Sequence, residues 1–324
     1  MRILLTGATG FLGNNIARSL VKQGHSIVVM LRHSSNQRTL DGIPHEPVIV
    51  DFESPADLSL AFENIDAVIH SAALIQIGWT KLALSRKINV EATSRIAEAA
   101  RRRNIRMVHI STIDALGMTT ETELGTETHL NPPKPGCSYV ISKREAETAV
   151  ILEVANGLDA VIVNPGFMVG PYDWRPSSGE IMLTLKKQFM PLAPAGGCCV
   201  ADVRDVADGV ISAMEHGKTG ERYILGGINM SYQELFHQMA SVMQCRSPKA
   251  KLPNWLASLV GKSGDLIGKI QGREPAINSA ATKMGQLFHY CDSEKAKQEL
   301  GYQIGSVEDG LKDAWDWFQA NGYV

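Results

Sequence analysis

The sequence predicts an α/β protein: a doubly wound parallel sheet with helices on both faces, and a smaller, mostly helical C-terminal lobe. Up to residue 166, short apolar runs alternate with amphipathic helical patterns, the order expected of strand–helix–strand units. A glycine-rich turn joins the first apolar run to the first helical pattern. Beyond residue 166 this alternation stops. We therefore expect one domain over 1–166, rejoined by 200–228, and an interleaved substrate-binding lobe over 167–324.

The glycine-rich turn follows the first expected strand, residues 3–5, and places Gly7, Gly10 and Gly13 three residues apart. In such a turn the first glycine permits the tight corner, the second lets backbone approach a pyrophosphate, and the third lets the helix pack closely. Free N–H groups and the dipole at the helix start attract phosphate. We interpret it as the phosphate-binding loop of a Rossmann-type domain, the alternative being a surface turn. The expected cofactor contacts here are Gly7, Thr9, Gly10, Phe11, Leu12 and Gly13.

The other elements follow from apolar runs and helical periods bounded by turn residues. Strands are expected at 25–31, 47–50, 66–70, 106–110 and 159–163, with 222–225 returning to the sheet. Helices are expected at 80–103, 139–154 and 181–188, from 203 onward, and at 232–243, 255–270 and 307–318. Prolines and polar residues make 119–136 a loop.

The end of the second strand indicates which dinucleotide binds. An acidic residue there would accept hydrogen bonds from the adenosine ribose of NAD, whereas arginine suits the 2′-phosphate of NADP. Arg32 stands at this turn with Arg38 just beyond, and the acid is missing. Because a guanidinium grips phosphate through paired donors, we predict NADP in preference to NAD. The alternative is that Arg32 is a solvated loop cation.

The carboxyl ends of two more strands are expected to line the cofactor. Small residues end the fourth strand and leave room for a ligand along the sheet edge. Asp51, with Phe52 beside it, follows the third strand and either reaches the adenine or caps the next loop. The residues expected near the cofactor here are Asp51, Phe52, Ser71, Ala72 and Ala73.

Three features together suggest hydride transfer: the glycine loop, a hydroxyl pair at the end of a strand, and a Tyr–Lys pair at a helix start. The fifth strand delivers Ser111 and Thr112 to its carboxyl end, and Tyr139 and Lys143 share one face of the next helix. A free phenol has a pKa of about 10, and a nearby ammonium favours the phenolate. We therefore expect Lys143 to bring the pKa of Tyr139 closer to neutral pH, so that the phenol can act as an acid or base. We also expect Lys143 to hold the nicotinamide ribose. Thr112, in preference to Ser111, would donate a hydrogen bond to the reacting oxygen.

With these residues the chain resembles the extended short-chain dehydrogenase/reductase superfamily over nearly its whole length. The resemblance also includes Asn164-Pro165, Gly170-Pro171, the segment 203–207 and the tail 300–302. It implies that Thr112, Tyr139 and Lys143 are catalytic, that 70–73 lines the cofactor, and that Pro165 lies near the nicotinamide. Counting back from Gly117 selects Thr112 over Ser111. Within the superfamily the chain looks most like the dihydroflavonol 4-reductase and 3β-hydroxysteroid dehydrogenase-like branch of the NAD-dependent epimerase/dehydratase group.

Other reactions of the superfamily compete with ketone reduction. Sugar 4,6-dehydratases carry Asp directly after the catalytic Thr, where this chain has Ile113, and we interpret the nearby Asp114 as structural. Nucleotide-sugar epimerases, which keep NAD(P) tightly bound, need no such carboxyl and stay open. A cofactor-sensing module without a reaction is a third class, against which the intact Tyr139 and Lys143 argue.

The substrate is expected to meet loops at 75–79, 167–174 and 188–194. Their large side chains would either surround a flat or aliphatic ketone or join the two lobes. These are Trp79, Phe167, Met168, Tyr172 and Trp174. A nucleotide sugar would instead need cations for its diphosphate, and those available are Arg175, Lys186, Lys187 and Arg204.

Composition narrows the partners to a small molecule. A net charge of −2 provides no global field for nucleic acid or anionic lipid, so neither nucleic acid nor membrane is expected as a partner. Five cysteines without C-x-x-C spacing or a histidine cluster indicate no metal site and a reducing compartment. No signal peptide or long apolar span is evident, so we expect a cytoplasmic protein. The helices at 89–100 and 139–154 are expected to form a homodimer.

Overall fold

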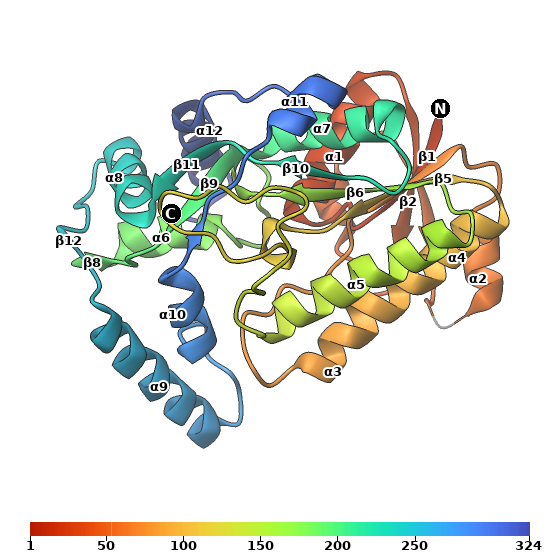
Figure 1. The fold of residues 1–324 in the computed structure, drawn as a ribbon. Coiled ribbons are helices and arrows are strands. Elements are labelled where there is room, and N and C mark those ends of the chain that lie inside the picture. Colours follow the sequence, from red (N-terminus) through yellow and green to blue (C-terminus); the bar gives the residue numbers. More distant parts are fainter. Residues whose placement is uncertain (53) are drawn as a thin grey trace.

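The computed structural model describes residues 1–52 and 54–324, and its centre is a seven-stranded parallel sheet (Figure 1). The strands run in the order β10-β6-β5-β4-β1-β2-β3, so the order reverses between β1 and β4. At such a reversal the connections leave in opposite directions and open a crevice at the carboxyl edge. The strands are β1 (Arg2–Thr6), β2 (Ser26–Leu31), β3 (Glu46–Ile49), β4 (Ala67–His70), β5 (Arg106–Ile110), β6 (Ala160–Pro165) and β10 (Arg222–Leu225). The predicted doubly wound α/β fold is confirmed.

Helices cover both faces of this sheet (Figure 1). On one face lie α1 (Phe11–Lys22), α7 (Val203–His216) and α11 (Glu294–Leu300), and on the other lie α2 (Pro55–Ala61), α4 (Ala92–Arg102) and α5 (Ser138–Ala155). Alternate side chains of each strand feed the two cores: Ile3 and Leu5 pack with α1 and α7, whereas Leu4 packs with α4 and α5. Burial on both faces explains why these strands are apolar throughout.

The helical region expected at 80–103 is interrupted. It consists of α3 (Leu82–Ser85), a π-helical segment η2 (Arg86–Glu91) and α4. Asn89 lies in the π segment and is buried. Its amide group accepts from the backbone N–H of Leu74 at 2.7 Å and donates to the Leu74 carbonyl at 2.9 Å. The widened helical turn therefore accompanies a side chain that holds the loop following β4.

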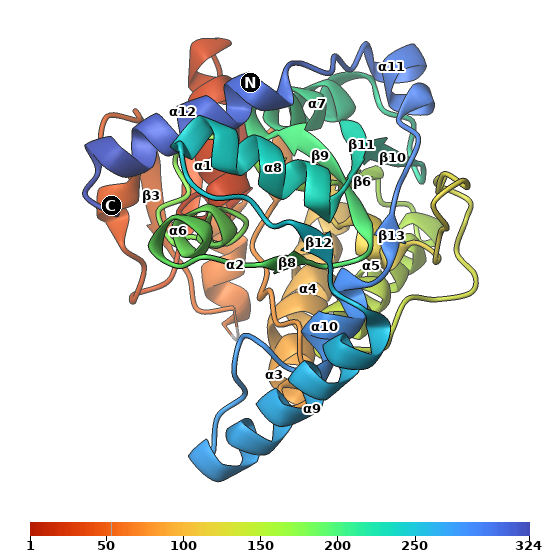
Figure 2. The same cartoon turned by 90° about the vertical axis from the view of Figure 1, so that its left-hand side faces the viewer.

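The second lobe contains a small sheet that the sequence did not predict (Figure 2). Its order is β11-β9-β13, with β7 also pairing β9. The strands are β7 (Phe167–Val169), β9 (Gly197–Asp202), β11 (Ile228–Ser231) and β13 (Phe288–His289). The three helices that pack with it were expected: α6 (Gly179–Lys187), α8 (Tyr232–Met243) and α12 (Val307–Ala320). A reciprocal capping box of Ser231 and Glu234 starts α8.

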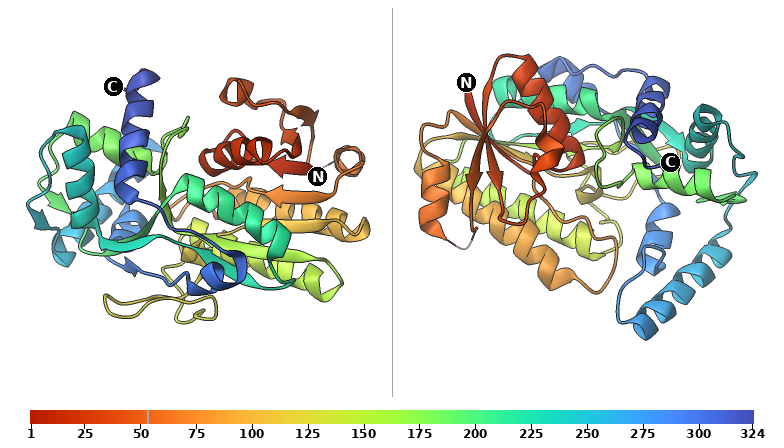
Figure 3. Two further views of the ribbon diagram at one scale, coloured as in Figure 1. Left: turned by 90° about the horizontal axis from the view of Figure 1, so that it is seen from above. Right: turned by 180° about the vertical axis from the view of Figure 1, so that it is seen from behind.

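A helical hairpin extends away from the rest of the molecule (Figures 1 and 3). It consists of α9 (Asn254–Gln271) and the short α10 (Ser279–Gly285). Just before α9, the strand β12 (Ala250–Lys251) pairs with β8 (Leu192–Ala193) and so attaches the start of the hairpin to the second lobe. Glycines allow the two arms to touch: a Cβ on Gly264 would lie 2.0 Å from the Ile277 carbonyl oxygen. The sequence predicted α9 but not α10 or α11, each only seven residues long.

The cysteines serve as small apolar side chains. All five are free, and Cys137, Cys198, Cys199 and Cys291 are buried. Within the described residues, no group of three or more His, Cys, Asp or Glu side chains is arranged to hold a metal ion. In the same part of the chain, every helix is too short or too polar to cross a lipid bilayer.

The glycine loop yields a matched pair of substitutions. A Cβ on Gly13 would lie 2.1 Å from the Gly7 carbonyl oxygen, whereas one on Gly10 would lie 3.2 Å from it. Gly13→Ala should therefore destabilise the fold by about 2 kcal/mol or more through overpacking. Gly10→Ala should stay folded but bind dinucleotide more weakly, because its methyl group occupies the phosphate approach. Thermal unfolding and NADPH titration measure the two effects, and a Gly13→Ala protein as stable as wild type would contradict this packing.

Candidate active site

The turn after β1 is fixed against the end of β4. Gly7 has a φ of +75°, and a Cβ there would lie 2.6 Å from the backbone nitrogen of Ala72. The Ala72 N–H donates to the Thr6 hydroxyl at 3.1 Å, and that hydroxyl contacts Nδ1 of His70 at 2.8 Å. Only glycine accommodates this conformation and this approach together. The structure thus brings Gly7 and the segment 71–73 side by side, as expected of one cofactor groove.

The start of α1 suits an anionic group. Its N-cap is Gly10, which offers no side-chain oxygen, and its first turn contains no acidic residue. The N–H groups of this turn, near Phe11 and Leu12, are therefore not capped by a side chain of Gly10. A phosphate is the complementary ligand for such a helix start, so these residues fit a dinucleotide.

The other predicted cofactor residues lie at the same edge of the sheet. Arg32 follows β2 and is exposed, and its guanidinium has no ion-pair partner among the described residues. Asp51 follows β3, where its N–H donates to Asp57 at 3.1 Å. Phe52 instead packs against the core between α2 and α4, beside a hollow of about 620 Å³, and its carbonyl accepts from Arg95. Core packing thus accounts for the Phe52 side chain.

Thr112, Tyr139 and Lys143 meet where β5 ends and α5 begins. Tyr139 is the second residue of α5 and is 9% exposed, while Lys143 is 3% exposed. The Lys143 ammonium donates to the Ile110 carbonyl at 2.7 Å. Thr112 caps the turn after β5 and hydrogen-bonds Tyr139 through its side chain. The Ser111 hydroxyl is buried without a partner in the described part of the chain, so Thr112 is the hydroxyl that meets the phenol.

Burial dominates the titration of this group. It raises the pKa of Tyr139, the charge of Asp114 adds to the increase, and the Thr112 hydrogen bond opposes it. Burial also lowers the pKa of Lys143 to about 8, against the charge of Glu147. The expectation that Lys143 brings the Tyr139 pKa toward neutrality is wrong for this structure. Desolvation raises the pKa of Tyr139, and the Lys143 ammonium, which donates to a carbonyl of β5, is not among the groups that lower it.

Asp114 belongs to a buried ionic cluster. Lys134 contacts its carboxylate at 3.1 Å and the Ile113 carbonyl at 2.8 Å, and His289 contacts it through Nδ1 at 2.8 Å. Although burial alone would raise it, the charges of Lys134 and His289 hold the pKa of Asp114 well below its usual range. Both partners occupy this carboxylate, as expected for a structural residue.

A second network of hydrogen bonds and an ion pair fixes the strands and the helix that carry the site. Sequence reasoning did not predict it. Asn164 donates to the Thr112 carbonyl at 2.9 Å and to Glu147 at 2.7 Å. Glu147 in turn pairs with Arg222 at 3.0 Å. These contacts connect β5, β6, β10 and α5. Pro165 ends β6 opposite Leu225, one residue from this network. The sequence signal that could have revealed this network is a polar residue, Asn164, within an otherwise apolar strand.

The loop beside Tyr139 is held by backbone and by Asn89. The N–H groups of Ser138 and Tyr139 donate to Gly78 at 2.8 Å and Gln76 at 3.1 Å. Asn89 holds the start of the same loop and also donates to the Ser142 hydroxyl at 2.9 Å. Asn89 is thus a positioning residue. The sequence feature that could have revealed it is a polar side chain within a predicted helix. Trp79, 39% exposed, ends this loop near Tyr139.

Most of the other large side chains expected around the substrate are used in packing instead. The rings of Tyr172 and Trp174 contact Trp317 of α12, with centroids 6.1 and 5.0 Å apart. Phe167 and Met168 pack against core clusters. Trp79 instead contacts the α9–α10 hairpin, where its indole donates to Ser279 and Lys283 lies over its ring.

Two of the four cations considered for a diphosphate are already engaged. Arg204 pairs with Asp202 and Asp313, each at 2.6 Å. Lys186 donates to the Met243 carbonyl at 2.9 Å and lies over the ring of Trp315.

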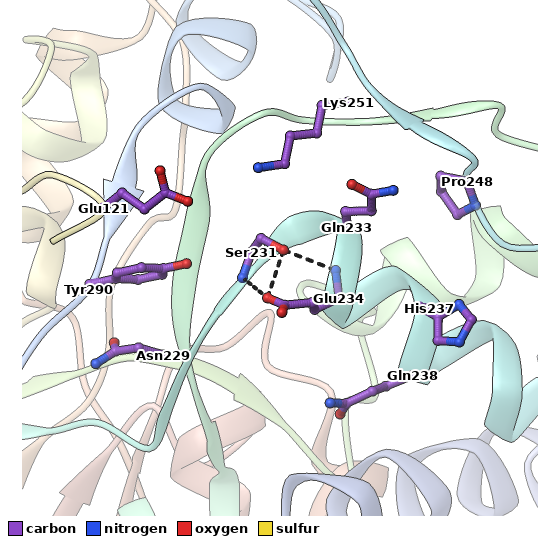
Figure 4. A pocket seen from close by; sticks show the side chains of 10 residues that line it. All are labelled: Glu121, Asn229, Ser231, Gln233, Glu234, His237, Gln238, Pro248, Lys251 and Tyr290. Atoms are coloured by element: carbon purple, nitrogen blue, oxygen red, sulfur yellow. Dashed lines mark hydrogen bonds between the residues drawn. The ribbon is translucent and has the colours of Figure 1, made fainter.

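A separate hollow of about 790 Å³ lies on the second lobe (Figure 4). Its lining is mostly polar and includes Asn229, His237, Lys251 and Tyr290, with Ser231 and Glu234 bonded to each other. None of the three catalytic candidates lines it. It is therefore distinct from the groove at the edge of the large sheet.

Comparison with known proteins agrees with this geometry. The model of the NAD dependent epimerase/dehydratase family matches residues 3–226. A putative dihydroflavonol 4-reductase from Synechocystis is 34% identical over 99% of this chain and 95% of its own length. Sterol demethylase protein B from Methylococcus capsulatus is 29% identical over the full length of both chains. A solved nucleoside-diphosphate-sugar epimerase from Pseudomonas aeruginosa has a TM-score of 0.83 at 26% identity, covering 100% of this chain and 99% of that one.

These relatives are reductases, epimerases and similar NAD(P)-dependent enzymes, and the match extends across both lobes. The resemblance to extended short-chain dehydrogenases/reductases is thereby confirmed. The chain belongs to the NAD dependent epimerase/dehydratase family and is an NAD(P)-dependent enzyme of the dehydrogenase/reductase type.

Proposed function

We propose that this enzyme is an NADP-dependent oxidoreductase that interconverts a ketone and an alcohol on a small, largely apolar or aromatic substrate. The observation that carries the proposal is the meeting of Thr112, Tyr139 and Lys143 at the end of β5, on the sheet edge that also bears the glycine loop. A proton donor, a second hydroxyl and an ammonium at one edge are the groups that carbonyl reduction requires.

The raised pKa of Tyr139 favours a proton-donating role. The phenol stays neutral at physiological pH, so it enters the reaction with its proton in place. Bound NADPH would supply the hydride for the carbonyl carbon, and the residues of this chain would act on the carbonyl oxygen, where negative charge develops. Tyr139 donates its proton to that oxygen while Thr112 donates a hydrogen bond. Lys143, as an ammonium, stabilises the phenolate that remains.

The cofactor is assigned to the groove at the topological switch. The amides near Gly10, Phe11 and Leu12 would bind the pyrophosphate, with Thr9 beside them. Arg32 would meet the 2′-phosphate, and Asp51 the adenine end. Ser71, Ala72 and Ala73 would line the middle of the groove, and Pro165 the nicotinamide. Lys143 would hold the nicotinamide ribose. NAD is the less favoured cofactor, because an exposed guanidinium follows β2 where NAD enzymes place an acid.

An apolar substrate is supported by the side chains left around the site. Ile77 and Met284 pack with Tyr139, while Arg204 and Lys186 already have partners and are poorly placed to bind a diphosphate. The names of two relatives, a dihydroflavonol 4-reductase and a sterol demethylase protein, point the same way. The alternative, a nucleotide-sugar epimerase that retains its NAD(P), is supported by the structural likeness to a sugar epimerase.

The assembly and compartment follow from the same considerations. We propose a homodimer through α4 and α5, whose paired outer faces include the exposed Leu152, and a mass of twice 35.3 kDa in solution would agree with it. The cytoplasm stays the expected compartment, because all five cysteines are free. We keep the expected division into a 1–166 domain, rejoined by 200–228, and a 167–324 lobe.

The reaction is tested by Tyr139→Phe. Removing the proton donor should lower kcat by about 10³-fold while leaving the Kd for NADPH nearly unchanged. Wild type should consume NADPH stoichiometrically when offered a panel of aryl and alicyclic ketones, whereas an epimerase shows no net cofactor turnover. Ketone-dependent NADPH oxidation and a separate NADPH titration measure both. An active Tyr139→Phe enzyme would remove Tyr139 from its assigned role.

Cofactor choice is tested by Arg32→Ala. Loss of a charge-assisted contact to the 2′-phosphate should raise the KM for NADPH by about tenfold or more and leave that for NADH unchanged. Lys22→Ala is the matched control, because Lys22 is an exposed cation at the far end of α1. If both variants lose NADPH affinity equally, general electrostatics rather than Arg32 selects the phosphate.

The pH profile tests the role of Lys143. Because its pKa lies at about 8, the ammonium is present below that pH and is lost above it, so reductase activity should fall as the pH rises through 8. Glu147→Gln removes the charge that raises this pKa; its one remaining oxygen can still accept from Asn164, while the bond from Arg222 is lost. The alkaline limb of kcat/KM should then move to lower pH, with the melting temperature measured in parallel. A limb that stays in place or moves upward would contradict the assignment.

A further inference from the structure

One face of α9 presents large apolar side chains to solvent. Trp255, Leu259, Leu266 and Ile270 are exposed by 70%, 56%, 61% and 78%. Their spacing places them on the same side of the helix. The opposite side is built of Ala257 and three glycines that pack against α10 and the intervening loop. Monomeric proteins rarely expose such a continuous patch unless it meets another surface.

The exposed apolar surface continues toward the active site. Ile277, between α9 and α10, is 61% exposed, and Trp79 and Ile75 in the neighbouring loop are 39% and 60% exposed. This loop is tied to the hairpin: the Trp79 indole donates to Ser279 at 2.8 Å, and Asn278 donates to the Ile77 carbonyl at 2.9 Å. The patch therefore spans two segments that lie far apart in the sequence.

The charge of the same segment differs from that of the rest of the chain. Residues 246–283 contain seven Lys or Arg and two acidic residues, so seven minus two gives a net charge of +5. Since the whole chain carries −2, the remainder carries −7. Both acidic side chains are engaged within the protein, Asp265 with the N–H of Ser279 and Glu274 with that of Trp79. Lys262, Lys269 and Arg273 are exposed on the hairpin.

We propose that the α9–α10 hairpin docks this enzyme onto an anionic lipid surface. The apolar side of α9 would enter the boundary between headgroups and acyl chains, with tryptophan and the cations at headgroup level, as in interfacial amphipathic helices. Overall charge led us to expect no lipid partner, but a surface encounters the charge of the part that faces it. A symmetric dimer through this face would oppose two hairpins that each carry four Lys or Arg and two acidic residues over 254–285, a net +2, next to the cations of 246–251; this disfavours a second copy as the occupant.

Docking would bring the catalytic tyrosine next to the membrane. Ala280 and Met284 of α10 form one packed cluster with Tyr139, and Ile77 of the adjoining loop packs against it. A carbonyl compound dissolved in lipid would then reach the site without first dispersing in water. This substrate route rests on the proposed ketone reduction, whereas the docking itself does not.

Vesicle co-sedimentation of the full chain, without cofactor or substrate, tests the proposal. We expect binding to vesicles of phosphatidylcholine with about 30% phosphatidylglycerol, weaker binding to phosphatidylcholine alone, and weakening by salt. Leu266→Glu should reduce binding by about tenfold, as loss of one buried leucine predicts. Leu60→Glu is the matched control: Leu60 lies on α2 and is 62% exposed, against 61% for Leu266, so the added charge is the same.

The outcomes separate docking from the reaction. Leu266→Glu should keep wild-type turnover of a water-soluble ketone, so a failed reaction and a failed docking are observed independently. Absence of wild-type binding to either vesicle, or equal losses in both variants, would overturn the proposal. So would a change in solution mass caused by Leu266→Glu without a change in vesicle binding, because the patch would then join protein chains.

Discussion

The contact between Gly13 of α1 and the carbonyl of Gly7 is the constraint on which the remaining arrangement depends. No side chain fits there, so α1 begins directly against the turn that leaves β1. The same turn abuts the backbone after β4, which closes the groove at the point where the strand order reverses. A bulkier contact at either place would move the helix start away from the sheet edge and separate the proposed phosphate site from the candidate catalytic residues.

Buried polar contacts stabilise the end of this edge that holds Thr112 and Lys143, beside the apolar cluster that contains Tyr139. Burial of Lys143 disfavours its charge, and the surrounding structure supplies the compensation: the Ile110 carbonyl accepts from it and Glu147 lies nearby. Asn164 connects Glu147 to the backbone of Thr112, so one network sets both the charge of the lysine and the position of the hydroxyl. Position and protonation are therefore coupled through the same few side chains.

Local sequence patterns predicted the elements whose formation depends on neighbouring residues. They failed for elements that form only through contacts with residues far along the chain. The parallel sheet and most long helices follow from periods of two and 3.6 residues, and β10 returned to the sheet at its expected bounds. The small sheet around β9 was missed, because its members are short and pair with strands far along the chain.

The candidate site shows the same limit. The spacing of Tyr139 and Lys143 predicted their common face, yet the pKa of Tyr139 shifts the other way because burial is a property of the folded chain. Asn89 and Asn164 act through contacts 15 or more residues away. Asn164-Pro165 was part of the resemblance, but that motif did not show which residues Asn164 contacts. Tyr172 and Trp174 were open to two interpretations from sequence, and only the position of α12 decided between them.

The composition of α9 cannot be explained by the folding of a single chain. Its packed side consists of small residues because α10 approaches closely, so the hairpin gains little apolar burial from its large side chains. Those side chains lie on the opposite side, where they oppose solubility and add nothing to the core. Because lysines lie beside these apolar side chains, this side of α9 does not belong to the hydrophobic core of the protein. Such a helix fits a partner outside the molecule, and the excess of positive charge over residues 246–283, which include it, fits the proposed anionic lipid surface.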